Sequence, residues 1–247
     1  MPVNKSHIGQ RQSGFTLIEI AVVLVIVGLL VGSFIGTFAQ RIDTTRRDNT
    51  VKELLEIKKV LIAYAFTQTP PRLPCPDVTG DGIQDLVAGD CQALSTEVWF
   101  LPWQDLGLGF GDAWDNRYRY WVNNAYARNA GFDLNAADDA AGGNATIQTR
   151  VNDAAVNMLD NAVAVIFSHG KNSLDAVSIE NDNRALLPAP GNDHDDEIGN
   201  LDNDRTFMSR SPSEEGSAST GGVYDDIVVW INSYEIKAAM VETGKLP

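Results

Sequence analysis

Residues 14–32 read GFTLIEIAVVLVIVGLLVG, and this stretch decides how the rest of the chain is organised. From Phe15 to Phe38 the only ionisable side chain is that of Glu19. A helical run of this length is enough to cross a bilayer about 30 Å thick. A lone carboxylate in hydrocarbon is costly unless it is paired, so Glu19 would need a specific partner there. We therefore expect a transmembrane segment over residues 15–38.

The residues before this run, MPVNKSHIGQRQSG, are polar and contain Lys5 and Arg11 but no acid. Basic residues ahead of an apolar segment favour a cytoplasmic location for that end. A secretory signal peptide would have a shorter apolar core, closed by a cleavage site of small residues. Because no such site closes this run, we disfavour a signal peptide, and an uncleaved signal anchor stays open as the alternative.

The stretch SGFTLIEIAVVLVIVGLLVG resembles the N-terminus of type IV pilins and of the pseudopilins of type II secretion. The resemblance implies that prepilin peptidase cuts between Gly14 and Phe15, removes the leader at residues 1–14, and that Phe15 is then N-methylated. It also implies that Glu19 pairs with the new amine of Phe15, in the same chain or a neighbouring subunit. Two paired charges at low dielectric cost far less than one alone, so Glu19 is expected to act in assembly.

The apolar pattern continues beyond the first run at helical spacing, and no proline occurs between Phe15 and Thr69. The later apolar positions are Val51, Leu54, Leu55, the stem of Lys58, Leu61, Ile62 and Ala65. We predict one spine helix over residues 15–69 and a globular head over residues 70–247. The expected fold class is α+β and pilin-like, with the long helix packed on an antiparallel sheet of about three to five strands and long loops.

Composition limits what the head can do. The 247-residue chain has a formal net charge of −14, and loss of the two basic residues of the leader would bring it near −16. Such a charge disfavours nucleic-acid binding through phosphates. Cys75 and Cys91 would both reach an oxidising compartment, so we expect a disulfide, with two free buried thiols as the alternative. The sequence contains no phosphate-binding loop, nucleophile elbow or paired histidines, and we do not expect an enzyme.

The segment between the cysteines, CPDVTGDGIQDLVAGDC, matches the front half of a calcium loop of the EF-hand type. The expected ligands are Asp77, Thr79, Asp81, the carbonyl of Ile83, and Asp85. Ala88 occupies the position where such loops carry a bidentate glutamate. The segment is therefore either a calcium site or an Asp- and Gly-rich turn without an ion.

A second acidic region follows in a long, loop-like segment between Lys171 and Gly222. A structureless loop of this length is unusual inside a domain unless it is functional or bound to something. A second metal site is one interpretation, and a solvated acidic loop is the other. The candidate ligands of this site are Asp193, Asp195, Asp202, Asp204 and Asp226.

Three strands and a terminal helix are expected in the head. The strands are residues 117–122, 162–167 and 223–231. The first and last resemble major-pseudopilin elements, through Asp112, Trp114, Asn116, Tyr118 and Tyr120 and through Asp226, Ile227 and Trp230. The last segment predicts a short helix capped by Asn232 or Ser233 and ended by Gly244.

Taken together, the sequence predicts a structural subunit of a type IV pilus-like or pseudopilus filament. Its partners would be other pilin or pseudopilin subunits, prepilin peptidase and an inner-membrane assembly platform. The large head favours a minor or tip subunit, anchored once in the inner membrane with its head in the periplasm. The alternative is a membrane-anchored periplasmic calcium-binding module that does not polymerise.

Overall fold

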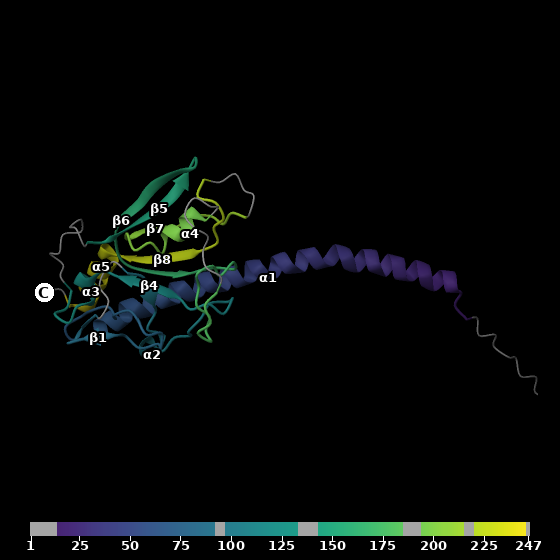
Figure 1. Ribbon diagram of the computed structural model, residues 1–247. Coiled ribbons are helices and arrows are strands. Elements are labelled where there is room, and N and C mark those ends of the chain that lie inside the picture. Colours follow the sequence, from purple (N-terminus) through teal and green to yellow (C-terminus); the bar gives the residue numbers. More distant parts are fainter. Residues whose placement is uncertain (1–13, 92–96, 133–142, 185–193, 215–219, 246–247) are drawn as a thin grey trace, which may run out of the picture. The chain divides into compact units, whose positions relative to one another are not determined.

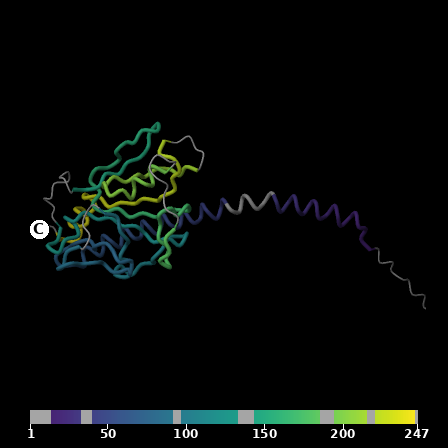
Figure 2. Tube along the Cα trace, in the orientation of Figure 1, coloured from purple at the N-terminus to yellow at the C-terminus, as the bar shows by residue number. Residues whose placement is uncertain are grey.

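The computed structural model describes residues 14–91, 97–132, 143–184, 194–214 and 220–245, and at residues 33–39 it describes the backbone alone. The chain divides into two compact units, residues 1–45 and 46–247, and each is described by itself. Figure 2 traces the path of the chain through them.

Helix α1 runs from Leu17 to Thr67 and is 51 residues long, which confirms the predicted single helix. It begins at a capping box, because Glu19 accepts hydrogen bonds from the backbone N–H and the hydroxyl of Thr16 while Thr16 Oγ1 accepts from the Glu19 N–H. Pro70 and Pro71 follow its end, where proline cannot continue a helix.

Among the residues that are described, no helix has the length and apolar character needed to cross a membrane.

In the second unit, the C-terminal part of α1 buries one stripe of side chains. Leu54, Ile57, Leu61 and Ala65 lie at the spacing of one helix face, and each is at most 3% exposed. Leu55 was expected in this stripe, but it is 45% exposed because it lies about 100° around the helix from Leu54. The prediction was therefore wrong for Leu55.

The head is built on a six-stranded sheet in which β3, β4, β6, β5 and β7 follow one another and β8 also pairs with β6. All pairs are antiparallel except β5 with β7, which is parallel, so the sheet is mixed (Figure 1). The strands are β3 Trp99–Phe100, β4 Arg119–Val122, β5 Ala145–Val151, β6 Ala154–Ser168, β7 Thr206–Met208 and β8 Ile227–Asn232.

The two faces of the sheet contribute to two hydrophobic clusters. The stripe of α1 packs with Tyr118, Tyr120 and Ile166 on one side. On the other side, Trp121 and Phe167 pack with Phe207 from β7. Alternate residues of β4 thus enter opposite clusters, as the period of a strand requires. Strand β4 is therefore covered on both faces.

The segment predicted as a long loop after Lys171 contains α4, Asp195–Gly199, and β7. The structure also adds β5 and extends β6 by eight residues before Ala162, where the sequence predicted only a short strand. This β5–β6 hairpin can be followed in Figures 1 and 2. Its distal residues are mostly exposed polar or small side chains, so no apolar run marks them in the sequence.

The remaining elements are short. They are β1 Leu86–Val87, β2 Asp90–Cys91, α2 Trp103–Leu106, α3 Asn124–Ala127 and α5 Ser233–Thr243. Helix α5 has Asn232 as its N-cap, in a capping box with Glu235, and Gly244 as its left-handed C-cap, which confirms the expected terminal helix. Cys75 and Cys91 form the expected disulfide.

Candidate functional site

The expected processing segment lies at the start of the described chain. Gly14 precedes the helix, and Phe15 is 83% exposed. Glu19 lies in the first helical turn, where it caps backbone N–H groups through the contacts with Thr16. The sequence T-L-I-E carries this capping signature, which the interpretation of Glu19 as an assembly residue did not use. Capping and pairing with a new N-terminus are compatible, because both contacts with Thr16 use Glu19 Oε2 and a carboxylate has a second acceptor oxygen.

Large apolar side chains after Phe15 are exposed in the described part of the first unit. Large hydrophobic residues from Leu17 to Val31 are between 47% and 89% exposed. Exposed apolar surface on this scale marks contact with a membrane or with other protein chains.

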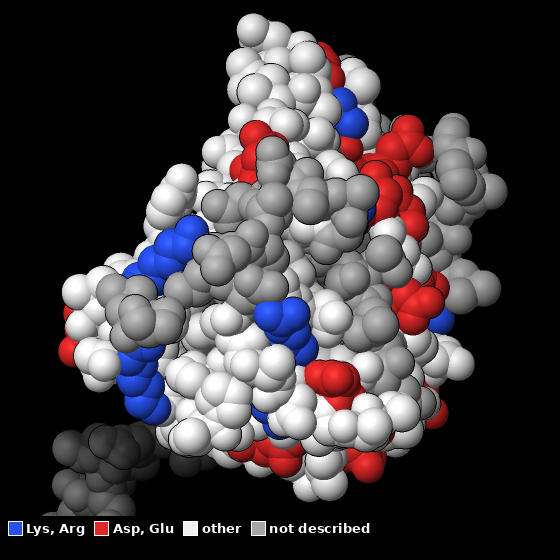
Figure 3. Space-filling model, turned by 90° about the vertical axis from the view of Figure 1, so that its left-hand side faces the viewer, with Lys and Arg blue, Asp and Glu red and all other residues white. Residues whose placement is uncertain are grey.

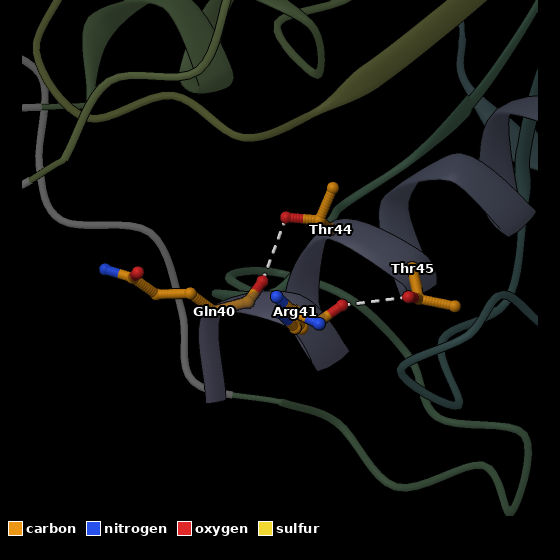
Figure 4. A pocket seen from close by; sticks show the side chains of 4 residues that line it. All are labelled: Gln40, Arg41, Thr44 and Thr45. Atoms are coloured by element: carbon orange, nitrogen blue, oxygen red, sulfur yellow. Dashed lines mark hydrogen bonds between the residues drawn. The ribbon is translucent and has the colours of Figure 1, made fainter. Parts of the chain in front are cut away.

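A hollow along α1 is lined by Gln40, Arg41, Thr44 and Thr45. The hydroxyls of the two threonines donate to the carbonyls of Gln40 and Arg41, four residues earlier, at 2.9 and 2.8 Å (Figure 4). These hydroxyls are therefore engaged within the helix. The hollow has no acidic or histidine side chain in its lining.

In the loop between the cysteines, the expected calcium ligands organise the backbone. Asp77 is buried and accepts hydrogen bonds from the N–H groups of Gly80 and Gly82 at 2.6 and 2.7 Å. Asp85 accepts from the N–H groups of Val78 and Thr79. Desolvation raises the pKa of Asp77, and the backbone hydrogen bonds oppose this shift.

Asp81 also has a local role, since its carboxylate accepts from the N–H of Ile83 at 2.9 Å. Asp77, Asp81 and Asp85 do not bring carboxylate oxygens together as a group of three within 4.8 Å. The geometry of this loop is that of a hydrogen-bonded turn closed by the disulfide.

The described residues bring three carboxylates within 4.8 Å of one another at one place, formed by Glu197, Asp225 and Asp226. Glu197 comes from α4, and the two aspartates directly precede β8. Figure 1 shows α4 and β8 in the same part of the head. We call this group the carboxylate cluster. Glu197 and Asp226 are each 2% exposed.

Amide groups hold the carboxylate cluster in place. Asn172 donates from its side chain to both oxygens of Glu197, at 2.8 and 2.9 Å, and from its backbone to Asp225 Oδ2 at 2.8 Å. Asn200 donates to Asp226 Oδ2 at 2.7 Å. The other oxygen of Asp225, Oδ1, is buried without a hydrogen-bond partner. An unsatisfied carboxylate oxygen beside two further carboxylates fits the oxygen ligands that calcium prefers.

The negative charges in this cluster repel one another. Burial raises the pKa of Asp225 to about 7, and the neighbouring charge of Glu197 acts in the same direction. Burial also raises the pKa of Asp226, again with a contribution from Glu197. His169 lies 3.9 Å from Asp226, but burial lowers the pKa of this histidine, so it does not supply a positive charge. At neutral pH the cluster therefore favours a proton or a bound cation.

A pair of arginines fixes the helix that carries Glu197. Arg150 contacts both oxygens of Asp196, at 2.6 and 2.8 Å, and Arg210 contacts the same carboxylate at 2.5 Å. Asp196 is 4% exposed, so these are buried, charge-assisted contacts. They join α4 to β5 and to the segment after β7.

The candidate ligands of the second expected metal site lie in two places among the described residues. Asp193 lies outside the described residues. Asp195, Asp202 and Asp204 line a hollow of about 200 Å³ together with Asp196, whereas Asp226 belongs to the carboxylate cluster. Asp202 and Asp204 accept hydrogen bonds from nearby backbone N–H groups.

Sequence reasoning found one of the three members of the cluster. Asp225 stands next to Asp226 immediately before an apolar strand, and this pair of adjacent acids was a sequence signal that could have identified Asp225. Glu197 stands among several acids, DHDDE, of which Asp196 is buried as well, so only its contact with Asp225 and Asp226 distinguishes it.

The face of the head in Figure 3 shows no broad basic area among its described residues. Acidic side chains gather toward one side of this face, and basic ones stand apart from one another.

Residues 9–35 match the prokaryotic N-terminal methylation motif. No curated protein and no solved structure matches the chain. The matched segment contains Gly14, Phe15 and Glu19, the residues on which the sequence interpretation depended. It is the N-terminal segment of pilins and pseudopilins that are processed by prepilin peptidase and assemble with other pilin subunits. This match supports a place in the type IV pilin and pseudopilin family, and it covers the N-terminal segment alone.

Proposed function

We propose that this chain is a structural subunit of a type IV pilus-like or pseudopilus filament. The N-terminal methylation motif at residues 9–35 carries the proposal. Prepilin peptidase cleaves between Gly14 and Phe15, Phe15 is N-methylated, and Glu19 pairs with the amine of Phe15 during assembly. The exposed apolar residues from Leu17 to Val31 support an inner-membrane anchor before assembly and helix contacts afterwards.

The head lies in the periplasm before assembly and on the filament surface afterwards. The disulfide between Cys75 and Cys91 supports export, because such bonds persist in oxidising compartments. The size of the head supports a minor or tip position, since close helical packing limits the space for each bulk subunit. An inner-membrane assembly platform is the proposed partner during polymerisation.

The head binds calcium at the carboxylate cluster in this proposal. Support comes from three acidic side chains within reach of one ion and from the buried, unpartnered oxygen of Asp225. The loop at Asp77 and the acids at Asp202 and Asp204 are weaker candidates, because in the described part of the chain their carboxylates do not form a group of three within 4.8 Å. Calcium would offset the repulsion within the cluster and tie α4 to the start of β8.

The N-terminus of the protein from native membranes tests the filament proposal directly. Intact mass and N-terminal sequencing should give a chain that begins at methylated Phe15. Retention of Met1 would instead support a signal anchor, and cleavage after the apolar run would support an exported soluble domain.

A Glu19→Ala variant separates assembly from anchoring. It should remain in the membrane fraction and disappear from sheared filaments, with the exposed Glu242→Ala as the matched control. If neither the variant nor the unaltered chain enters filaments, the anchored calcium-binding module becomes the better account.

A further inference from the structure

A small cavity lies against the C-terminal part of α1, within the head unit. Its volume is about 200 Å³, and its lining includes Glu53, Glu56, Ile57, Leu108 and Tyr118. The two glutamates are exposed, whereas Ile57 and Tyr118 are buried. The cavity therefore combines an apolar floor with an acidic rim.

The acidic rim is partly fixed in position. The hydroxyl of the buried Tyr118 donates to Glu53 Oε2 at 2.6 Å, which holds this carboxylate beside the cavity. Glu56 makes no hydrogen bond or ion pair within the described part of the chain. Its carboxylate is thus available to a group that approaches from outside.

The chemistry of the cavity fits a lysine side chain. Lysine packs its methylene stem on apolar surface and keeps its ammonium group at a polar edge. Ile57 and Leu108 would contact the stem, and the two glutamates would accept from the ammonium group.

The same helix presents lysines of this kind on a neighbouring face. Lys52 and Lys59 are exposed and have no ion pair among the described residues. They are seven residues apart, so they lie close to one line along the helix. Glu56 is rotated from that line by about 50° and Glu53 by about 110°, because each residue advances about 100°. One helix therefore carries a lysine face and, beside it, a glutamate-rimmed cavity.

The charge of the chain also favours this contact between copies. Residues 68–247 contain 11 basic and 28 acidic residues, a formal charge of −17, whereas residues 46–67 contain five basic and three acidic residues. Neighbouring heads therefore repel one another. Basic groups that dock on a neighbouring chain reduce this repulsion.

We propose that the cavity is a docking site for Lys52 or Lys59 of a second copy of this chain. This inference rests on the proposed filament function. Lys52 and Lys59 are not among the residues that line the cavity, so the contact is heterologous and leaves one cavity and one set of lysines free on the outer copies. Such a contact can repeat along a filament.

Charge reversal in the full-length chain tests the contact. The variants are Glu56→Lys, the pair Lys52→Glu with Lys59→Glu, and the three changes combined, all expressed with the native assembly machinery. The exposed Glu242→Lys on α5 is the control, because it makes the same charge change away from the cavity. The readout is the share of the chain in the sheared filament fraction.

Either reversal alone should lower the filament share by about tenfold, as expected for a close charge pair converted to repulsion. The combined variant should recover most of it, and the control should match the unaltered chain. Thermal unfolding of each variant checks that the head still folds. As a second measurement, co-expressed Glu56→Cys and Lys59→Cys, or Glu56→Cys and Lys52→Cys, should give a disulfide-linked dimer that neither partner forms alone.

Normal filaments from both reversed variants, without a mixed dimer, would overturn this inference and leave the proposed function intact. A combined variant that stays as low as the single reversals would also overturn it. Absence of the unaltered chain from the filament fraction would overturn the proposed function, and this inference with it.

Discussion

Asp225→Asn should stabilise the head at about pH 8 in metal-free buffer and have little effect at about pH 4. Asp225 is mostly buried, and one of its oxygens has no hydrogen-bond partner. Ionisation of this carboxyl therefore costs free energy in the folded state, and asparagine removes that cost while keeping the shape of the side chain.

The size of the effect follows from the shifted pKa. Burial, aided by the charge of Glu197, raises the pKa of Asp225 from 3.8 to about 7 in the folded protein. An acid with a raised folded-state pKa binds more protons when folded, so stability falls as pH rises from about 4 to about 7. About three pKa units correspond to an upper limit of about 4 kcal/mol, reached above pH 7.

Denaturant unfolding followed by tryptophan fluorescence measures this difference. The pH dependence between about pH 4 and pH 7 should be steeper for the unaltered chain than for Asp225→Asn, and the exposed Asp48→Asn should behave like the unaltered chain. With calcium the unaltered chain should become the more stable of the two, because calcium binds the folded state with the complete cluster more tightly than it binds the variant. Equal pH profiles, or a variant less stable than the unaltered chain at about pH 8 without metal, would refute the reasoning.

Three further changes test the supports of the head. Replacing Cys75 and Cys91 with serine should lower the free energy of unfolding by about 3 kcal/mol, since the bond closes a loop of about 15 residues; reduction of the unaltered protein should give the same loss, and an unchanged stability would contradict it. Gly221→Ala should lower the melting temperature, because Gly221 has a φ of +98° and an added Cβ would lie 2.3 Å from Asp196 Oδ2; a melting temperature equal to that of the unaltered chain would show that α4 is held differently. Asn232→Ala should cost about 1 kcal/mol through loss of the α5 cap, with Asn232→Ser retaining most of the stability in the same unfolding assay.

The elements that the sequence predicted correctly have a strong local pattern. Helix α1 has an apolar period, a capping signature at Thr16 and two prolines beyond its end. Strand β4 alternates around buried aromatic residues, and α5 has a cap at Asn232 and a stop at Gly244. In each case the determining interactions lie within a few residues along the chain.

The elements that the sequence missed are held by distant contacts. Strand β7 is short and pairs in parallel with β5, some sixty residues earlier in the chain, so no hairpin turn marks it in the sequence. Helix α4 stands in an acidic segment without an apolar period, and it is fixed through Asp196 by Arg150 and Arg210. Local propensity therefore favoured a loop, and tertiary contacts decided otherwise.

The sequence by itself determined the N-terminal motif around Gly14, Phe15 and Glu19. The motif is a continuous segment, and the cap at the start of α1 joins residues only three apart in the chain. The sequence also determined which cysteines were available to pair, since there are only two. Only the tertiary structure decided which of the many acids meet. Glu197, Asp225 and Asp226 converge because β8 brings the end of one loop to α4, and no local pattern in the sequence encodes that convergence.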